Sequence, residues 1–301
     1  MKLLGILTLV AGLTAIALPG SAQLVPVQNQ YFINPFTYNP AAVGFDQTTQ
    51  LHTSFRKQWT GTAGSPTLAT ITFEKPLDRL SLGANLTNLA EGPFNSLNTN
   101  LTAGYRFRMS NRPKQWLSFG MTLGVRLNSL RTNKIDDPDD PAVLAYPSTG
   151  LVLDGGFGVR YRYERFTLGL AVPRLTNTLR NESDRALLGG LRPLDHVIGS
   201  ASYDFIPHLT DWKITPTLLY HYAVAYEAQW EGMLMASFRK KFWGGAGFRQ
   251  RYGLNALAGA EITPTLAFTY AYSLASGANY FPSSHEIVLR LRLDKQEAVM
   301  R

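Results

Sequence analysis

Residues 97–108 read LNTNLTAGYRFR, and residues 117–128 read LSFGMTLGVRLN. In both stretches, large apolar side chains alternate with small or polar ones from beginning to end. An apolar period of two indicates a β-strand with one apolar and one polar face. The polar faces carry Gly, Ser, Thr, Asn and Arg. A strand that separates lipid from a polar lumen needs this arrangement.

The same alternation recurs along the chain and predicts about 14 antiparallel strands. We expect them at residues 48–59, 67–75, 80–89, 97–108, 115–128, 151–163, 166–172, 196–205, 213–222, 226–238, 242–249, 254–262, 265–273 and 286–293. The fold class is therefore all-β, and the architecture is either a transmembrane outer-membrane β-barrel or a soluble β-sandwich. The connections 129–150, 173–195 and 274–285 are long and fall on the same side of the strands. Long connections at one end of the strands and short ones at the other favour the barrel.

Aromatic residues near the ends of the predicted strands are a second barrel feature. In a membrane barrel they would form girdles at the two lipid–water interfaces. The residues concerned are Trp59, Trp116, Tyr163, Phe166, Trp212, Tyr222, Trp243 and Tyr272.

The amino terminus has the three regions of a secretory signal peptide. Lys2 is followed by an apolar run to Leu18 and then by small residues that end at Ala22. The run is short for a transmembrane helix, and no later run approaches the ~18 apolar residues that a helix needs to span a bilayer. We expect a signal peptide at 1–22, a periplasmic or plug segment at 23–47, the outer-membrane barrel at 48–293 and a tail at 294–301.

Composition narrows the possible functions. The chain has 301 residues, no cysteine, a formal charge of +8 and only 17% charged residues. Soluble domains average roughly 25% charged residues. The absence of cysteine excludes disulfides, a thiolate metal site and a Cys nucleophile. In an exported barrel, the positive charge does not point to nucleic acid as a partner.

Arginines sort onto the polar faces of the strands, where a lumen or its rim would hold them. The set comprises Arg56, Arg106, Arg108, Arg126, Arg160, Arg162, Arg290 and Arg292. They either line the lumen as solvated or carboxylate-paired groups, or form a basic interior that holds an acidic plug or partner segment. The expected lumen carboxylates are fewer, namely Glu74 and Asp154, with Glu227 and Glu231 as further candidates. The interior is therefore expected to be net positive.

No pattern of catalytic residues stands out. The histidines are scattered, and no G-x-S-x-G nucleophile motif occurs. The acidic run Asp136, Asp137, Asp139 and Asp140 is either a solvated loop or a calcium site, although it lacks the ligand spacing of an EF-hand. We expect no enzyme activity and no cofactor.

Residues 28–44 read QNQYFINPFTYNPAAVG and do not alternate. Their two Asn-Pro steps disfavour a regular helix or a central strand. The segment lies across the periplasmic mouth, enters the lumen, or simply leads into the first strand. This run, followed by Arg56-Lys57-Gln58-Trp59 and, near the other end, by SSHEIVL at 283–289, resembles the PorP/SprF family of outer-membrane proteins.

The resemblance implies a fourteen-stranded barrel of the type IX secretion system of Bacteroidota, which acts in secretion, surface attachment of adhesins or gliding motility. It implies outer-membrane lipids, a periplasmic ring lipoprotein and the C-terminal sorting domains of cargo as partners. The residues that match the family motifs are Asn34, Pro35, Tyr38, Asn39, Pro40, Arg56, Gln58, Trp59, His285 and Glu286. We expect most of them to be structural. The alternative function is a channel for solutes or lipids.

Overall fold

The computed structural model describes residues 28–135, 137–139, 143–144, 149–175, 195–224, 226–274 and 282–294. The strands are β1 Gln50–Lys57, β2 Thr67–Leu77, β3 Leu80–Glu91, β4 Phe94–Ser110, β5 Gln115–Leu130, β6 Thr149–Tyr163, β7 Phe166–Val172, β8 His196–Tyr203, β9 Trp212–Ala223, β10 Tyr226–Phe238, β11 Phe242–Arg249, β12 Gly253–Glu261, β13 Leu266–Ser273 and β14 Ser284–Arg292. Four short 3₁₀ turns accompany them: η1 Asn29–Phe32, η2 Pro35–Thr37, η3 Pro40–Ala42 and η4 Thr132–Lys134.

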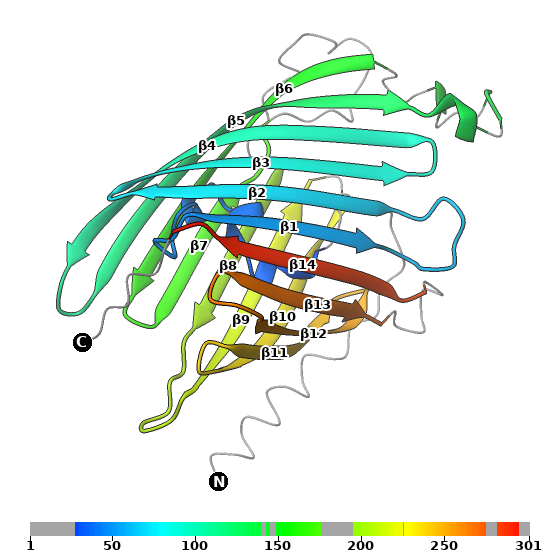
Figure 1. Ribbon diagram of the computed structural model, residues 1–301. Helices are drawn as coiled ribbons and strands as arrows, with labels where there is room; N and C mark the ends of the chain where they lie inside the picture. Colours follow the sequence, from blue (N-terminus) through cyan, green and yellow to red (C-terminus); the bar gives the residue numbers. More distant parts are fainter. Residues whose placement is uncertain are drawn as a thin grey trace.

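All fourteen strands join into one closed antiparallel barrel (Figure 1). Each strand pairs with its neighbours in sequence, and β1 closes the ring on β14 in a register that runs from Gln50 opposite Arg292 to Lys57 opposite His285. The prediction of a barrel of about 14 antiparallel strands is confirmed, and the alternative of a sandwich is wrong. No helix in the described ranges is long and apolar enough to cross a bilayer.

The two ends of the barrel differ in their connections. At one end, here called the turn end, no connection is longer than residues 204–211 between β8 and β9. The opposite end, the loop end, carries the connections 131–148, 173–195 and 274–283, which lie largely outside the described residues. The wall is also uneven, because β4, β5 and β6 contain 17, 16 and 15 residues whereas β7 contains 7 (Figure 1).

The two faces of the wall have opposite polarity. Leu101 and Leu123 face outward and are 67% and 71% exposed, whereas the neighbouring inward positions Thr102 and Ser118 are buried. An apolar outer band around a polar interior suits a wall that stands in lipid. The alternation in the sequence therefore reflects the difference between lipid and lumen.

Two aromatic residues do not belong to the predicted girdles. Trp116 shares its inward parity with Ser118, and its ring lies beneath the guanidinium of Arg106. Trp243 donates from Nε1 to Thr269 Oγ1 at 3.1 Å and packs against a buried cluster inside the barrel. The girdle prediction is wrong for these two residues because it used their position along the strand and ignored their parity.

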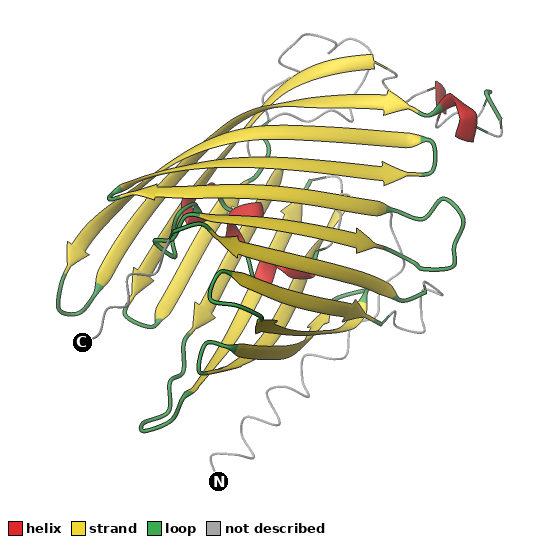
Figure 2. Cartoon of the chain, in the orientation of Figure 1, coloured by secondary structure: helices red, strands yellow, loops and turns green. Residues whose placement is uncertain are grey.

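The barrel is filled by the chain that precedes β1. Residues 28–47, here called the inner segment, contain η1, η2 and η3, and Figure 2 shows these turns inside the ring of strands. Most of the segment is buried. The expected signal peptide at 1–22 and all but Asp294 of the expected tail lie outside the described residues.

Candidate functional site: the filled lumen

The two Asn-Pro steps build two of the turns of the inner segment. The side chain of Asn34 accepts a hydrogen bond from the backbone N–H of Phe36 at 3.2 Å, and that of Asn39 accepts one from Ala41 at 2.9 Å. Each Asn is thus the N-cap of a turn whose first residue is proline, a position where a missing N–H costs nothing. The two Asn-Pro pairs, which disfavour a regular helix or strand, therefore specify compact turns.

The same asparagines attach the segment to two different parts of the wall. Asn34 Nδ2 donates to Thr72 Oγ1 on β2 at 2.8 Å, and Asn39 Nδ2 donates to the carbonyl of Val159 on β6 at 3.4 Å. One amide group thereby caps a turn and anchors it. This double use accounts for Asn rather than Asp before each proline, because an ionised carboxylate only accepts hydrogen bonds, whereas the amide both accepts and donates.

The turn η3 lies directly against β4, β5 and β6, where the wall presents glycines. A Cβ atom at Gly120 would overlap the backbone of Pro40, and one at Gly158 would overlap the side chain of Asn39. The backbones can approach this closely only because these positions lack side chains. The strand glycines on this wall therefore shape the lumen around the segment.

Aromatic side chains of the segment supply the apolar part of the packing. Tyr31 and Tyr38 contact each other edge to face at 5.4 Å between ring centroids and are buried with Ile198 and Leu219. Burial raises the pKa of both tyrosine hydroxyls, so both remain neutral. Phe36 and Val43 form a second cluster at the opposite wall, where they contact the Gly83 position.

Glu286 on β14 fixes the first turn of the segment. Its Oε2 accepts from the N–H of Asn29 at 2.7 Å and its Oε1 from the N–H of Gln30 at 3.0 Å. Arg56, its register partner on β1, donates to Oε2 at 3.1 Å. The carboxylate is completely buried, with 0% exposure. A single acid thus joins the first strand, the last strand and the inner segment.

Polar contacts continue from Glu286 across the lumen. Asn29 Nδ2 donates to Ser273 Oγ at 3.1 Å, and Asn29 Oδ1 accepts from Arg249 Nη2 at 3.4 Å. Arg249 in turn pairs with Glu231 at 2.5 Å, whose other contact is His221 Nε2 at 2.9 Å. We call this set, from Arg56 and Glu286 to His221, the lumen network.

A second buried carboxylate holds the other end of the segment. Glu74 on β2 accepts from the N–H of Gly44 at 2.8 Å and from Gln50 Nε2 at 3.2 Å. Asp46 is the only acidic residue within 28–47. The alternative of an acidic plug in a basic lumen is therefore wrong, because the segment supplies N–H donors and the wall supplies the carboxylates.

The predicted lumen and rim arginines fall into two groups. Arg56 and Arg126 pair with the buried carboxylates Glu286 and Asp154, and at the turn end Arg290 and Arg292 lie 3.2 and 2.8 Å from Glu261. The remaining four lie at the turn end of β4 and β6, beside aromatic rings. They are Arg106, Arg108, Arg160 and Arg162.

The motif residues from the two ends of the sequence meet at the loop end of the β1–β14 seam. The N–H of Trp59 donates to Ser284 Oγ at 3.2 Å, and the buried Gln58 donates from its N–H to the carbonyl of Pro66 at 2.9 Å. His285 instead faces outward, where its Nδ1 lies 2.6 Å from the hydroxyl of Tyr270. It takes no part in the lumen network.

Sequence reasoning missed Asn29, Gln30, Ser273 and Arg249 as network members. Arg249 shares the parity of Gly245 and Gly247 on β11, so the alternation alone could have placed it inside. Ser273 likewise shares the inward parity of Thr269 and Ala271 on β13. Asn29 and Gln30 carry no such signal, because their partners lie more than 200 residues away in the sequence.

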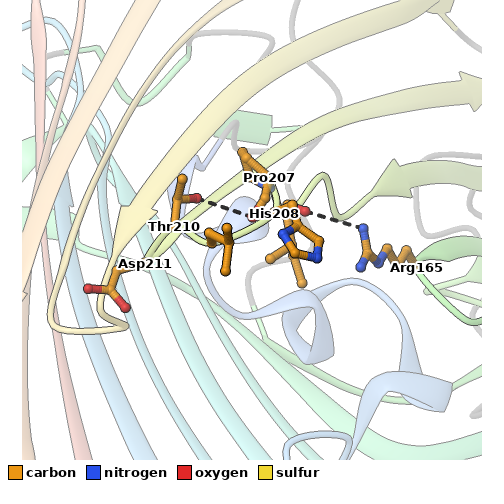
Figure 3. Close-up of a pocket in the computed structure, with 7 residues that line it drawn as sticks. Arg165, Pro207, His208, Thr210 and Asp211 are labelled. Carbon is orange, nitrogen blue, oxygen red and sulfur yellow. Dashed lines mark hydrogen bonds between the residues drawn. The ribbon is translucent and has the colours of Figure 1, made fainter.

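Two further features are the acidic run of the 131–148 connection and a hollow at the turn end. Asp136 and Asp140 of the acidic run lie outside the described residues, and within the described part no group of three His, Cys, Asp or Glu side chains could hold a metal ion. A hollow of about 690 Å³ at the turn end is lined by Arg165 and residues 206–211 (Figure 3). Arg165 Nη1 donates to the carbonyl of Ile206 at 3.4 Å, which ties the β8–β9 connection to the β6–β7 turn.

Comparisons with known proteins agree with this architecture. A Pseudomonas aeruginosa FadL homologue matches with a TM-score of 0.50 at 11% identity, covering 87% of this chain and 94% of its own. The outer membrane protein Omp33 of Acinetobacter baumannii matches with a TM-score of 0.46 at 10% identity, covering 81% and 98%. These likenesses concern the fold alone. No curated protein sequence matches the chain.

The family comparison covers almost the whole chain. The family described as type IX secretion system membrane protein PorP/SprF matches residues 20–291. The residues that carried the resemblance in the sequence, near both of its ends, converge on the seam and the inner segment. The family and the closed barrel together confirm the predicted location in the outer membrane.

Proposed function

The chain belongs to the PorP/SprF family of type IX secretion system membrane proteins, and from that premise we propose that it helps to secrete cargo proteins or to anchor them at the cell surface. The family match over residues 20–291 carries this proposal. The family consists of secretion-system components and not of enzymes. In this role the barrel acts by binding proteins at its two ends.

The filled lumen supports this role over that of a solute or lipid channel. The inner segment contacts β2, β6, β9 and β14 and is anchored by buried carboxylates at both of its ends. A transport path needs an open or easily opened lumen. A barrel packed in this way is suited to present fixed surfaces.

We assign the turn end to the periplasm, since barrels of this class have short periplasmic turns. The turn end then faces the ring lipoprotein, and the loop end faces the C-terminal sorting domain of exported cargo. The seam at Trp59 and Ser284 lies at the loop end and couples the β1–β2 and β13–β14 connections. This coupling provides a rigid base beneath loops that would contact cargo.

Deletion of the gene tests the proposal. We expect the deletion strain to lose surface display of particular cargo proteins while uptake of small solutes stays normal. The measurement is surface proteomics of intact cells beside a solute-uptake assay, and re-expression of the wild-type chain serves as the control. Unchanged display of every cargo protein would refute the proposal.

A further inference from the structure

Four arginines at the turn end form a grid on the inner surface of the wall. In the register of β4, β5 and β6, Arg106 lies opposite Ser118, which lies opposite Arg160. One rung nearer the end, Arg108 lies opposite Trp116, which lies opposite Arg162. We call these four arginines and Trp116 the arginine grid. Neighbouring strands are about 4.8 Å apart, so the four positive charges are close together.

Aromatic rings lie beside all four arginines of the grid. The guanidinium carbons of Arg106 and Arg108 lie 4.7 and 5.1 Å from the ring centroid of Trp116. Phe45 of the inner segment lies under Arg160 and Arg162, at 3.8 and 5.3 Å. A ring orients a guanidinium through its quadrupole but leaves its positive charge uncompensated.

Three of the four, Arg106, Arg108 and Arg160, differ in their partners from the other inward arginines. Arg56, Arg126, Arg249 and Arg290 each pair with an inward carboxylate. Within the described part of the chain, no carboxylate lies in ion-pairing distance of Arg106, Arg108 or Arg160, and Asp78 and Asp46 act on Arg106 and Arg160 only at longer range. Arg162 shares Asp204 with Lys213, at 3.3 and 3.6 Å.

Like charges repel one another, so an anionic partner would stabilise the part of the grid that has no ion pair within the described residues, namely Arg106, Arg108 and Arg160. We propose that the arginine grid is a docking surface for an acidic segment of a periplasmic protein. A protein segment is favoured over lipid headgroups because all four arginines share the inward parity of Thr102 and Gly158. Phosphates of the surrounding lipid would instead meet the outward positions, such as Tyr163.

The aromatic side chains define the kind of segment that fits. Trp116 is only half-buried, Arg108 is exposed, and Arg162 retains 30% of its exposure, so the grid can be reached from the mouth. Arginine forks bind carboxylates in a bidentate manner, and the spacing of the rungs suits Asp or Glu side chains along an extended chain. This inference rests on the proposed function, which places the turn end in the periplasm and gives the partner a role in secretion.

A binding titration with the purified barrel tests the surface directly. The probe is a fluorescein-labelled polyglutamate peptide, followed by fluorescence anisotropy at low and high salt. We expect saturable binding that weakens with salt and is reduced about a hundredfold in the variant Arg106→Gln/Arg108→Gln, because each of the two charge-assisted contacts contributes about tenfold. Heat-modifiability on electrophoresis confirms that each variant is a folded barrel.

The matched control is Arg290→Gln/Arg292→Gln, which removes the same charge from the same end at arginines already paired with Glu261. We expect this variant to bind the peptide like the wild type. Equal losses in both variants, or the absence of saturable binding to the wild type, would overturn the docking surface.

A photocrosslinking amino acid at position 116, with position 163 as the outward control, separates protein from lipid in intact membranes. Crosslinks from position 116 to Asp- and Glu-rich peptides support the proposal, whereas crosslinks to lipid alone refute it. The titration requires neither cargo nor secretion. A negative titration would therefore refute the docking surface alone. The cargo-display experiment would still decide the proposed function.

Discussion

At the scale of single residues, Glu286 connects the first strand, the last strand and the inner segment. It accepts two backbone N–H groups and the guanidinium of Arg56, all buried. Removing one partner of a buried pair leaves an uncompensated charge and typically costs about 3–5 kcal/mol. We expect Glu286→Gln to fold into a barrel with a lower unfolding temperature, measured by heat-modifiability, and to expose Tyr31 and Phe36 to chymotrypsin.

The matched control for Glu286→Gln is Glu261→Gln. Glu261 also pairs with arginines, but at the rim, where it retains 15% of its side-chain exposure and its partners retain 19%. Water compensates part of a broken pair there, so the loss of stability is smaller. Equal unfolding temperatures for Glu286→Gln and the wild type would contradict the assigned role of Glu286.

At the scale of elements, the fit between η3 and the wall depends on strand glycines. Gly120→Val would place methyl groups where the backbone of Pro40 lies. We expect this variant to form the barrel but to displace the inner segment, which faster chymotrypsin cleavage within residues 28–47 would reveal. The control is Gly244→Val on β11, where the nearest atom to an added Cβ is 3.6 Å away. Similar protection in both variants would show that η3 does not need the glycine.

The elements also show what sequence could and could not predict. Strand alternation is a local property that lipid on one side imposes at every second residue, so the strands around 97–108 and 117–128 were predictable. The turns of the inner segment were not, since Asn-Pro steps indicate turns without saying what they pack against. Trp116 and Trp243 were misplaced because their parity was ignored, and Asn29 was missed because its acceptor Glu286 is 257 residues away.

At the scale of the whole molecule, the packed lumen predicts an electrically silent barrel. We expect the wild-type protein to produce no ion conductance in planar bilayers. A variant that lacks residues 28–44 should conduct and prefer anions, because inward arginines such as Arg106 and Arg160 would then face water. Heat-modifiability of the variant serves as the folding control. Conductance of the wild type equal to that of the deletion variant would favour the channel alternative.

The attachment of the inner segment to Glu286 has a consequence for the order of assembly. The segment precedes β1, but the acceptor for its first turn lies on β14, the strand that closes the ring. Asn29 and Gln30 therefore gain their carboxylate only when the final strand is in place. Arg56 and Glu286 also face each other across the closing seam, so correct closure and seating of the segment depend on the same ion pair. A truncated or wrongly registered barrel would lack this carboxylate beside Asn29 and Gln30.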